Sequence, residues 1–281
     1  MNAVPDRSQL SWQSSPQGEG SPVNSGVFSR WQLDGRVVLV TGASSGLGRH
    51  FAHLLSSAGA KVALAARRTD KLEASVRQIE ALGAKARAVA LDVTSASSVK
   101  GCFDELTADW GVPDVVVNNA GITVTRPMLE QTEEDWDLVM STNLKGCWLV
   151  ATEAARRMVA AGKGGAIVNV ASILAERVAG CVAPYAISKA GVVQATKAMA
   201  LELARHRVRV NSLLPGYIAT ELNREFMDSE AGEKLRARIP SRRFGELTDL
   251  DGPLLLLASD AGAAMSGACV AVDGGHLVSS L

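Results

Sequence analysis

The amino-acid sequence predicts an α/β protein: a single domain with a doubly wound parallel sheet of about seven strands and helices on both faces. Short runs of branched apolar residues alternate with amphipathic segments from Leu33 to the C-terminus. This alternation is typical of a parallel sheet covered on both faces. With 281 residues, 47% of them hydrophobic, the chain can build one full core. Because the composition does not change again after Leu33, we expect one domain over residues 33–281.

Residues 1–32 have a different composition. They are rich in Ser, Pro, Gly and Gln and show no hydrophobic periodicity. Such a segment cannot bury enough apolar area to offset the entropy lost on ordering, so we expect a disordered N-terminal tail. It lacks the continuous apolar core of a secretory signal, while a transit peptide, which is usually richer in arginine, stays open as an alternative.

The first half of the domain is expected to hold four strands, each followed by a helix. The strands are short apolar runs, and the helices have apolar residues at three- and four-residue spacing. The expected strands are 36–40, 61–65, 86–91 and 114–117, and the expected helices are 47–58, 70–82, 95–110 and 132–161. Thr132 is placed to cap the last of these helices, with three acidic residues following in its first turn.

The second half continues the alternation. The expected strands are 166–171, 207–213 and 269–272, and the expected helices are 184–204 and 249–258. Between them, residues 220–239 form an irregular helical segment with outward charges. We interpret this segment as a mobile lid, with Leu222, Phe226 and Met227 available to face inward.

Composition excludes several classes of partner. The formal net charge is zero and no basic stripe is present, so neither nucleic acid nor an anionic membrane surface is an expected partner. No apolar run reaches the roughly 18 residues of a membrane-spanning helix. The four cysteines form no C-x-x-C pair, and no histidine lies at zinc-ligand spacing. We therefore expect reduced thiols, a cytoplasmic location and no metal.

The first strand ends in a glycine turn, Thr41–Gly48, with the spacing G-x-x-x-G-x-G. Gly42 permits a tight turn, Gly46 lets backbone N–H groups approach a pyrophosphate, and Gly48 lets the helix pack on the sheet. The N-terminus of that helix then faces the phosphates. The turn therefore predicts a dinucleotide site rather than a simple connection. The expected contacts are Gly42, Ser44, Ser45, Gly46, Leu47 and Gly48.

The end of the second strand indicates which dinucleotide. An acidic residue there would bind the ribose 2′-hydroxyl of NAD, but the position holds Ala66, followed by Arg67 and Arg68. A guanidinium can hold a 2′-phosphate through two hydrogen bonds, so we expect NADP(H), with Arg67 as the first candidate. The alternative is that both arginines are solvated surface charges.

Two more strand ends extend this site. Asp92 could accept a hydrogen bond from the adenine amino group with Val93 against the ring, although Asp92 could instead cap the next helix. After the fourth strand, the small residues Asn119, Ala120 and Gly121 let backbone approach the nicotinamide ribose.

A second group of residues has the chemistry for proton transfer. Strand 166–171 ends at Ser172, and a helix from Pro184 would place Tyr185 and Lys189 on one face, one turn apart. A phenol, an ammonium and a hydroxyl in this arrangement suit proton transfer to a carbonyl oxygen.

The ordered set of motifs resembles the short-chain dehydrogenase/reductase family. TGASSGLG, NNAG, Asn143, Ser172, YAISK, Pro215-Gly216 and a closing VDGG occur in the family's order at suitable spacings. The resemblance covers the chain from about Leu33 onward and implies a Rossmann-type fold. A YxxxK motif alone is common by chance, whereas the whole set is specific.

The resemblance implies roles for four catalytic residues. Tyr185 would be the general acid for reduction and the general base for oxidation. A free phenol titrates near pH 10, so a nearby positive charge, that of Lys189, is needed to favour the phenolate. Lys189 would also hydrogen-bond the nicotinamide ribose. Ser172 would orient the substrate oxygen, and Asn143 would hold a helix irregularity and a water that links Lys189 to solvent. The complete set disfavours a nucleotide-sensing protein without activity.

The resemblance also extends the cofactor site past the sixth strand. Pro215, Gly216, Ile218 and Thr220 would hold the nicotinamide carboxamide, although Thr220 could be only a helix cap. The expected substrate pocket is mostly apolar: Ile173, Leu174, Ala179, Val182, Tyr217 and Leu222.

These residues predict interconversion of a ketone or aldehyde with an alcohol by hydride transfer. The alternative is reduction of 3-oxoacyl groups on acyl-carrier protein or coenzyme A. An acidic carrier would need a basic rim, but segment 128–135 is acidic, which leaves Arg126, Arg177 and Arg205–Arg207 to supply one.

The family likeness finally implies a homotetramer, or a homodimer, built through the helices that carry Asn143 and Tyr185. The apolar residues that could associate on these helices are Leu149, Val150, Met158, Val193 and Met199.

Overall fold

The computed structural model describes residues 25–221 and 223–279. Its centre is one seven-stranded sheet in the order β3-β2-β1-β4-β5-β6-β7, and every neighbouring pair is parallel. The strands are β1 (Val37–Thr41), β2 (Lys61–Ala66), β3 (Ala86–Ala90), β4 (Val115–Asn118), β5 (Gly165–Val170), β6 (Val208–Pro215) and β7 (Cys269–Val272). The predicted fold class is confirmed.

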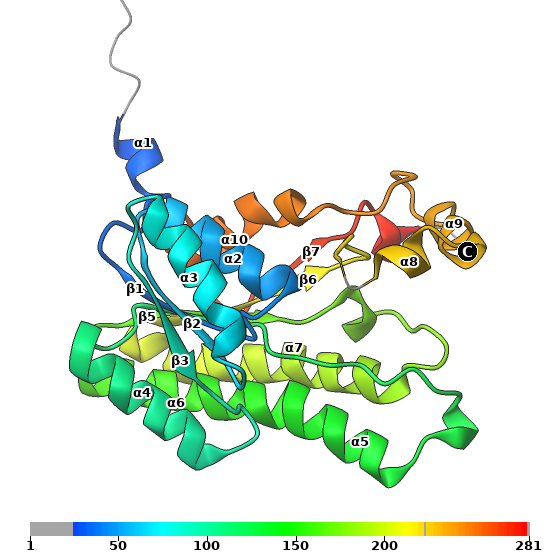
Figure 1. The fold of residues 1–281 in the computed structure, drawn as a ribbon, viewed down its shortest axis with the longest axis horizontal. Coiled ribbons are helices and arrows are strands. Elements are labelled where there is room, and N and C mark those ends of the chain that lie inside the picture. Colours follow the sequence, from blue (N-terminus) through cyan, green and yellow to red (C-terminus); the bar gives the residue numbers. More distant parts are fainter. Residues whose placement is uncertain (1–24, 222, 280–281) are drawn as a thin grey trace, which may run out of the picture.

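Helices cover both faces of this sheet (Figure 1). One face carries α2 (Gly46–Ser57), α3 (Asp70–Ala81) and α10 (Asp251–Ala258). The other carries α4 (Ala96–Trp110), α6 (Cys147–Ala160) and α7 (Ala183–Leu203). Side chains alternate between the two faces along a strand. In β1, Val38 therefore packs against the α2, α3 and α10 layer, and Leu39 packs against the α4, α6 and α7 layer. Both are fully buried, as a two-sided parallel sheet requires.

The remaining helices are short. α5 (Glu133–Met140) precedes α6, while α8 (Arg224–Met227) and α9 (Glu230–Arg236) lie in the predicted lid segment. Thr132 caps α5 as expected, and its hydroxyl and the Asp135 carboxylate form a reciprocal capping box. Single 3-10 turns occur at Met128–Glu130, Ile173–Ala175, Ala204–His206, Leu247–Leu250, Asp260–Gly262 and His276–Val278.

One prediction needs correction. The expected tail, residues 1–32, extends too far: α1 (Ser25–Ser29) is helical, and the Arg30 carbonyl accepts a hydrogen bond from Ala261 N–H (3.0 Å), which fastens residues next to Leu33 to the domain. Residues 1–24 lie outside the described part. The long helix expected over 132–161 carries an irregularity at the expected place: a π-helical turn, Ser141–Gly146, lies between α5 and α6 and contains Asn143.

The strand order determines where a ligand can bind. From β1 the chain proceeds outward to β2 and β3, then returns to β4 on the other side of β1. At such a reversal the connections on the two sides diverge and leave a crevice beyond the carboxyl ends of the strands. Within the described ranges, no helix combines the length and apolarity needed to cross a bilayer.

Candidate active site

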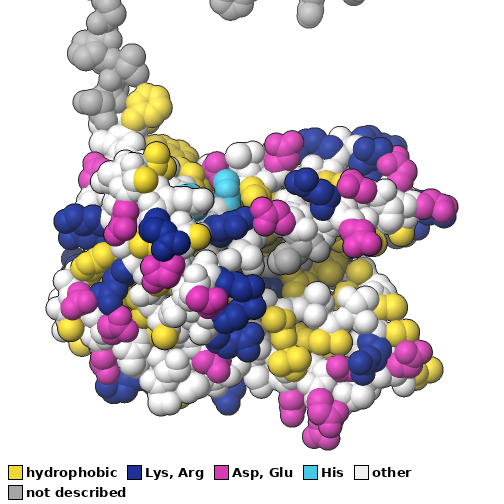
Figure 2. All heavy atoms as spheres, in the orientation of Figure 1, with side chains coloured by type: hydrophobic (Ala, Val, Ile, Leu, Met, Phe, Trp, Pro, Cys, Tyr) yellow, Lys and Arg dark blue, Asp and Glu magenta, His cyan; other side chains and the backbone are white. Residues whose placement is uncertain are grey.

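A cavity of about 880 Å³ occupies this crevice. Its lining residues come from the segments that follow β1 to β6 and from the lid. Figure 2 shows the molecule hollowed at this place, between the α8–α9 segment and α5, with apolar side chains on the walls and Lys and Arg side chains beside it. The predicted cofactor and catalytic segments therefore meet around one cavity.

Most of the predicted residues line this cavity. At the cofactor positions they are Gly42, Ser44, Ser45, Gly46, Leu47, Arg67, Arg68, Asp92, Val93, Asn119, Ala120, Gly121, Pro215, Gly216, Ile218 and Thr220. At the catalytic and substrate positions they are Ser172, Tyr185, Lys189, Ile173, Leu174, Ala179, Val182 and Tyr217. Two do not line it: Gly48 and Asn143 lie behind its wall. Leu222 falls outside the described residues.

The glycine turn leaves space that a side chain would fill. Gly42 and Gly46 have φ angles of +64° and +52°, a conformation that favours glycine. A Cβ on Gly48 would lie 2.3 Å from the Gly42 carbonyl oxygen and 2.5 Å from Asn119 Nδ2. Gly48 therefore sets how closely the start of α2 approaches the turn. The resulting cradle, at a helix N-terminus, fits the pyrophosphate of a dinucleotide.

Thr41, which the sequence analysis did not select, fastens this cradle to β4. Its hydroxyl oxygen accepts hydrogen bonds from the backbone N–H groups of Asn119 (3.0 Å) and Ala120 (3.1 Å). The Asn119 side-chain amide also donates hydrogen bonds to the backbone carbonyls of Thr41 (3.1 Å) and Gly42 (3.2 Å). The two strand ends on either side of the crevice are thus held together.

The end of β3 presents a fixed carboxylate. Asp92 Oδ1 accepts from the N–H (3.0 Å) and the hydroxyl (2.8 Å) of Thr94. These bonds, and to a smaller extent the charge of Arg67, hold the pKa of Asp92 below its ordinary value. Ser95 caps α4 instead, by accepting from Ser98 N–H (3.2 Å). The capping alternative for Asp92 is therefore not observed.

Lys189 and Ser172 have defined partners at the catalytic end. Lys189 is 5% exposed, and its ammonium donates to the Val170 carbonyl (2.8 Å) and lies 5.6 Å from the centre of the Tyr185 ring. The Ser172 oxygen accepts from Leu174 N–H (3.1 Å), which leaves its hydroxyl hydrogen free to donate to a ligand. Ser172, Lys189 and the Tyr185 phenol line the same cavity, so all three proton donors are available to one bound ligand.

Asn143 lies in the π-helical turn, where the resemblance placed a helix irregularity. Its side chain is buried and forms a two-way bridge to Ile122, accepting from the N–H (2.8 Å) and donating to the carbonyl (2.9 Å). It thereby fixes the segment after β4 that lines the cavity.

The rest of the cavity wall includes residues that the sequence analysis did not assign to the pocket. Hydroxyl-bearing and amide residues among them are Thr123, Thr125, Thr142 and Asn223. Only the fold could place these four there, since no local pattern marks them. Phe226 and Met227, which were expected to face inward from segment 220–239, also line the cavity. Thr220 does not cap α8, because Asn223 occupies that position.

Tyr217 is the second phenol of the cavity. Burial raises the pKa of Tyr217, and the nearby Tyr185 adds to the shift, so this phenol keeps its proton at neutral pH. Its ring packs against His276 with centroids 5.7 Å apart. Tyr217 can therefore offer a neutral hydroxyl to a substrate.

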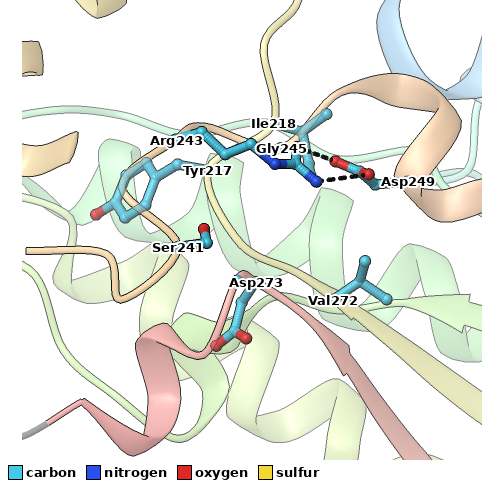
Figure 3. Close-up of a pocket in the computed structure, with 9 residues that line it drawn as sticks. Tyr217, Ile218, Ser241, Arg243, Gly245, Asp249, Val272 and Asp273 are labelled. Atoms are coloured by element: carbon cyan, nitrogen blue, oxygen red, sulfur yellow. Dashed lines mark hydrogen bonds and ion pairs between the residues drawn. The ribbon is translucent and has the colours of Figure 1, made fainter. Parts of the chain in front are cut away.

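A smaller cavity of about 160 Å³ lies behind Tyr217 and Ile218 (Figure 3). Arg243 crosses it to form a paired contact with Asp249, at 2.6 and 2.9 Å. This guanidinium holds the pKa of Asp249 at about 2. The Arg243–Asp249 ion pair joins the two ends of segment 243–249. Within this segment, the Gly245 N–H donates a hydrogen bond to the Tyr217 carbonyl (2.9 Å).

Comparisons with known proteins agree with this site. The family profile described as Enoyl-(Acyl carrier protein) reductase matches residues 42–276. The 2-dehydro-3-deoxy-D-gluconate 5-dehydrogenase of Escherichia coli is 36% identical over 252 residues, covering 89% of this chain and 99% of that protein. A 3-oxoacyl-acyl-carrier-protein reductase of Thermotoga maritima is 36% identical over 88% of this chain and 100% of its own.

Solved structures give the same result. A gluconate 5-dehydrogenase from Burkholderia cenocepacia, crystallised with NADP and tartrate, is 36% identical, has a TM-score of 0.86 and covers 90% of this chain and 99% of its own.

Fold, site and relatives together define a nucleotide-dependent oxidoreductase. The chain belongs to the short-chain dehydrogenase/reductase family, as the motifs predicted. Among the described residues no three His, Cys, Asp or Glu side chains are grouped to hold a metal ion.

Proposed function

We propose that this protein interconverts a ketone or aldehyde with the corresponding alcohol, using NADP(H), with Tyr185 as general acid and base. The observation that carries the proposal is that Ser172, Tyr185 and Lys189 share one cavity with the glycine cradle. A proton donor is thus placed within the same enclosure as a dinucleotide site.

The residues around the cavity fit NADP(H). The cradle from Gly42 to Leu47 would hold the pyrophosphate, Arg67 and Arg68 the 2′-phosphate, and Lys189 the nicotinamide ribose. NADP bound to the Burkholderia relative supports this assignment. When bound, the cofactor supplies or accepts the hydride.

The chain's own residues handle the proton. In reduction, Ser172 donates a hydrogen bond to the carbonyl oxygen and Tyr185 transfers its phenolic proton to that oxygen. In oxidation, Tyr185 takes the hydroxyl proton instead. The Lys189 ammonium, beside the Tyr185 ring, stabilises the phenolate that reduction leaves behind.

Substrate class follows from the charges on the cavity wall. Four of the described lining residues carry charge: Arg67, Arg68, Asp92 and Lys189. The two arginines and Asp92 follow β2 and β3, away from Tyr185, and Lys189 is engaged behind the phenol. The substrate end is left with hydroxyl, amide and apolar groups, which suit an uncharged carbonyl compound.

Reduction of 3-oxoacyl thioesters is the second candidate. The Thermotoga relative supports it. The acidic segment opposes it, because Glu130, Glu133 and Glu134 are exposed and Arg126 is paired with Asp135 (2.7 Å), which leaves this rim poorly suited to an acidic carrier.

An NADPH-oxidation screen distinguishes these functions. The panel comprises uncharged small ketones, alicyclic ketones, steroids, keto-sugars, keto-acids and 3-oxoacyl thioesters. Turnover that is fastest with uncharged ketones supports the proposal, and turnover confined to thioesters supports the second candidate. Tight NADPH binding with no turnover of any carbonyl compound would instead indicate a sensing protein.

Arg67 is expected to set the cofactor preference. Arg67→Ala removes a charge-assisted contact of about 1.5–3 kcal/mol, so KM for NADPH should rise by about 10- to 100-fold while KM for NADH changes little. Arg77→Ala is the matched control, since Arg77 is an exposed arginine of α3 away from the cavity lining. If the ratio of KM for NADPH to KM for NADH is unchanged in Arg67→Ala, another residue must hold the 2′-phosphate.

We further propose a homotetramer built through α5, α6 and α7. Of the residues expected to associate, Val150, Met158 and Val193 are buried in the protomer's own core, while Leu149 and Met199 are half-buried and pack against it. Other apolar side chains on these helices are exposed by 41–52%: Trp136, Leu138, Trp148 and Ile187. Light scattering should give the mass of four chains, and a mass of one chain would refute the assembly.

A cytoplasmic location is part of the proposal. All four cysteines are free, and a reducing compartment preserves free thiols. Cell fractionation followed by detection of the protein tests the location.

A further inference from the structure

The helix that carries Tyr185 and Lys189 contains a hydroxyl that the proposed mechanism does not use. Ser188 precedes Lys189 directly, and its side chain is fully buried. A buried hydroxyl is retained at low cost only when its hydrogen bonds are made.

The bonds of Ser188 lead from the cavity wall to the catalytic tyrosine. Asn143 Nδ2 donates to the Ser188 oxygen (3.1 Å), and the Ser188 hydroxyl donates to the Tyr185 carbonyl (2.7 Å). Asn143 is itself bridged to the backbone of Ile122 in both directions. These bonds connect three segments: the loop after β4, the π-helical turn, and the first turns of α7.

We propose that Ser188 is a positioning residue for Tyr185. Through it, Asn143 fixes the turn of α7 that holds the phenol at a set place relative to Lys189 and to the loop that lines the cavity. The Ser188 hydroxyl has one hydrogen, which is given to Tyr185, and the Asn143 amide uses its remaining N–H on Ser188. Removing the hydroxyl therefore removes both bonds.

The same helix offers a matched control. Thr196 is also fully buried; its hydroxyl accepts from Asn169 Nδ2 (2.9 Å) and donates to the Val192 carbonyl (2.8 Å). The chemistry equals that of Ser188, but Thr196 lies about two turns further along α7. Thr196→Val therefore removes an equivalent buried bond without touching the Tyr185 turn.

The sequence makes a direct measurement available, because the chain has two tyrosines, Tyr185 and Tyr217. Protein labelled with 13C at the tyrosine ring carbon that bears oxygen gives two resonances, which Tyr185→Phe assigns. Titrating these resonances follows ionisation of the Tyr185 phenol without any substrate. This readout does not rest on the proposed function, so failure of that function leaves it intact.

Ser188→Ala is expected to shift the Tyr185 titration relative to the unsubstituted protein, because the phenol no longer keeps its place beside the Lys189 ammonium. Thr196→Val should leave it unchanged while lowering the melting temperature by a similar amount. With an accepted ketone, Ser188→Ala should also lower kcat by about 10- to 100-fold, with little change in KM for NADPH.

Two outcomes would overturn the proposal. In one, the Tyr185 titration is unchanged in Ser188→Ala. In the other, it moves equally in Ser188→Ala and Thr196→Val, which would make Ser188 a stabilising residue only. If Ser188→Ala does not fold, Ser188→Cys, whose thiol is a weaker donor and acceptor, should give a shift of the same direction and smaller size.

Discussion

Tyr185→Phe should lower kcat for any accepted ketone by about 10²- to 10⁴-fold, the contribution typical of a positioned acid or base. The substitution removes one oxygen and keeps the ring that lies 5.6 Å from Lys189 Nζ. Because the cradle and Arg67 are untouched, the Kd for NADPH should stay within about threefold of the wild-type value. Steady-state kinetics gives the first quantity and quenching of tryptophan fluorescence the second.

Retained NADPH binding is the internal control, since it separates lost chemistry from lost folding. A Tyr185→Phe enzyme with wild-type turnover and normal binding would remove Tyr185 from the catalytic set. Loss of both binding and turnover would point to a structural role for the phenol.

Gly48→Ala should have the second large effect, on cofactor binding and on stability together. The added methyl would lie 2.3 Å from the Gly42 carbonyl oxygen and 2.5 Å from Asn119 Nδ2, so the start of α2 must move away from the turn. Overpacking of this kind costs about 1–3 kcal/mol, and more where backbone cannot shift. We expect a lower melting temperature and NADPH binding weakened by at least about tenfold, measured by calorimetry and titration.

Gly101→Ala provides the comparison. Gly101 is an exposed helical glycine of α4, and a Cβ there would meet no atom within 4 Å. Alanine should stabilise this position by about 0.5–1 kcal/mol and leave NADPH affinity unchanged. If Gly48→Ala behaved like Gly101→Ala, the close packing of α2 on the turn would not be needed for the cofactor.

The parts of the fold that depend on neighbouring residues were predictable. An apolar run such as Val37–Val40 and the glycines from Gly42 to Gly48 determine a strand, a turn and a helix start within a few residues. The parallel order then brought the cofactor and catalytic segments to one sheet edge, as strand–helix alternation implies.

Contacts between distant segments were not predictable. Asn143 meets Ile122, 21 residues away, and Ser188, 45 residues away, and no periodicity records either pairing. The partner of an apolar helix face could not be predicted from the sequence either. Val150 and Met158 were apolar in the sequence, but only the fold shows that they pack inside the protomer rather than on a neighbour.

Arg67 marks an intermediate case. Its place after β2 follows from counting along the chain, whereas its proximity to Asp92, which follows the next strand β3, comes from the pairing of the two strands in the sheet. The sequence pattern identified Arg67 as a candidate, whereas only the fold shows which charged groups surround it.

The bond between Thr41 and Asn119 also has a consequence for synthesis of the chain. It joins residues 78 positions apart, so the cofactor cradle stays open until Asn119 has emerged from the ribosome. The catalytic turn needs residues up to Lys189, which are translated later. Since the chain is made from its N-terminus, the residues that form this bond are available before those of the catalytic turn.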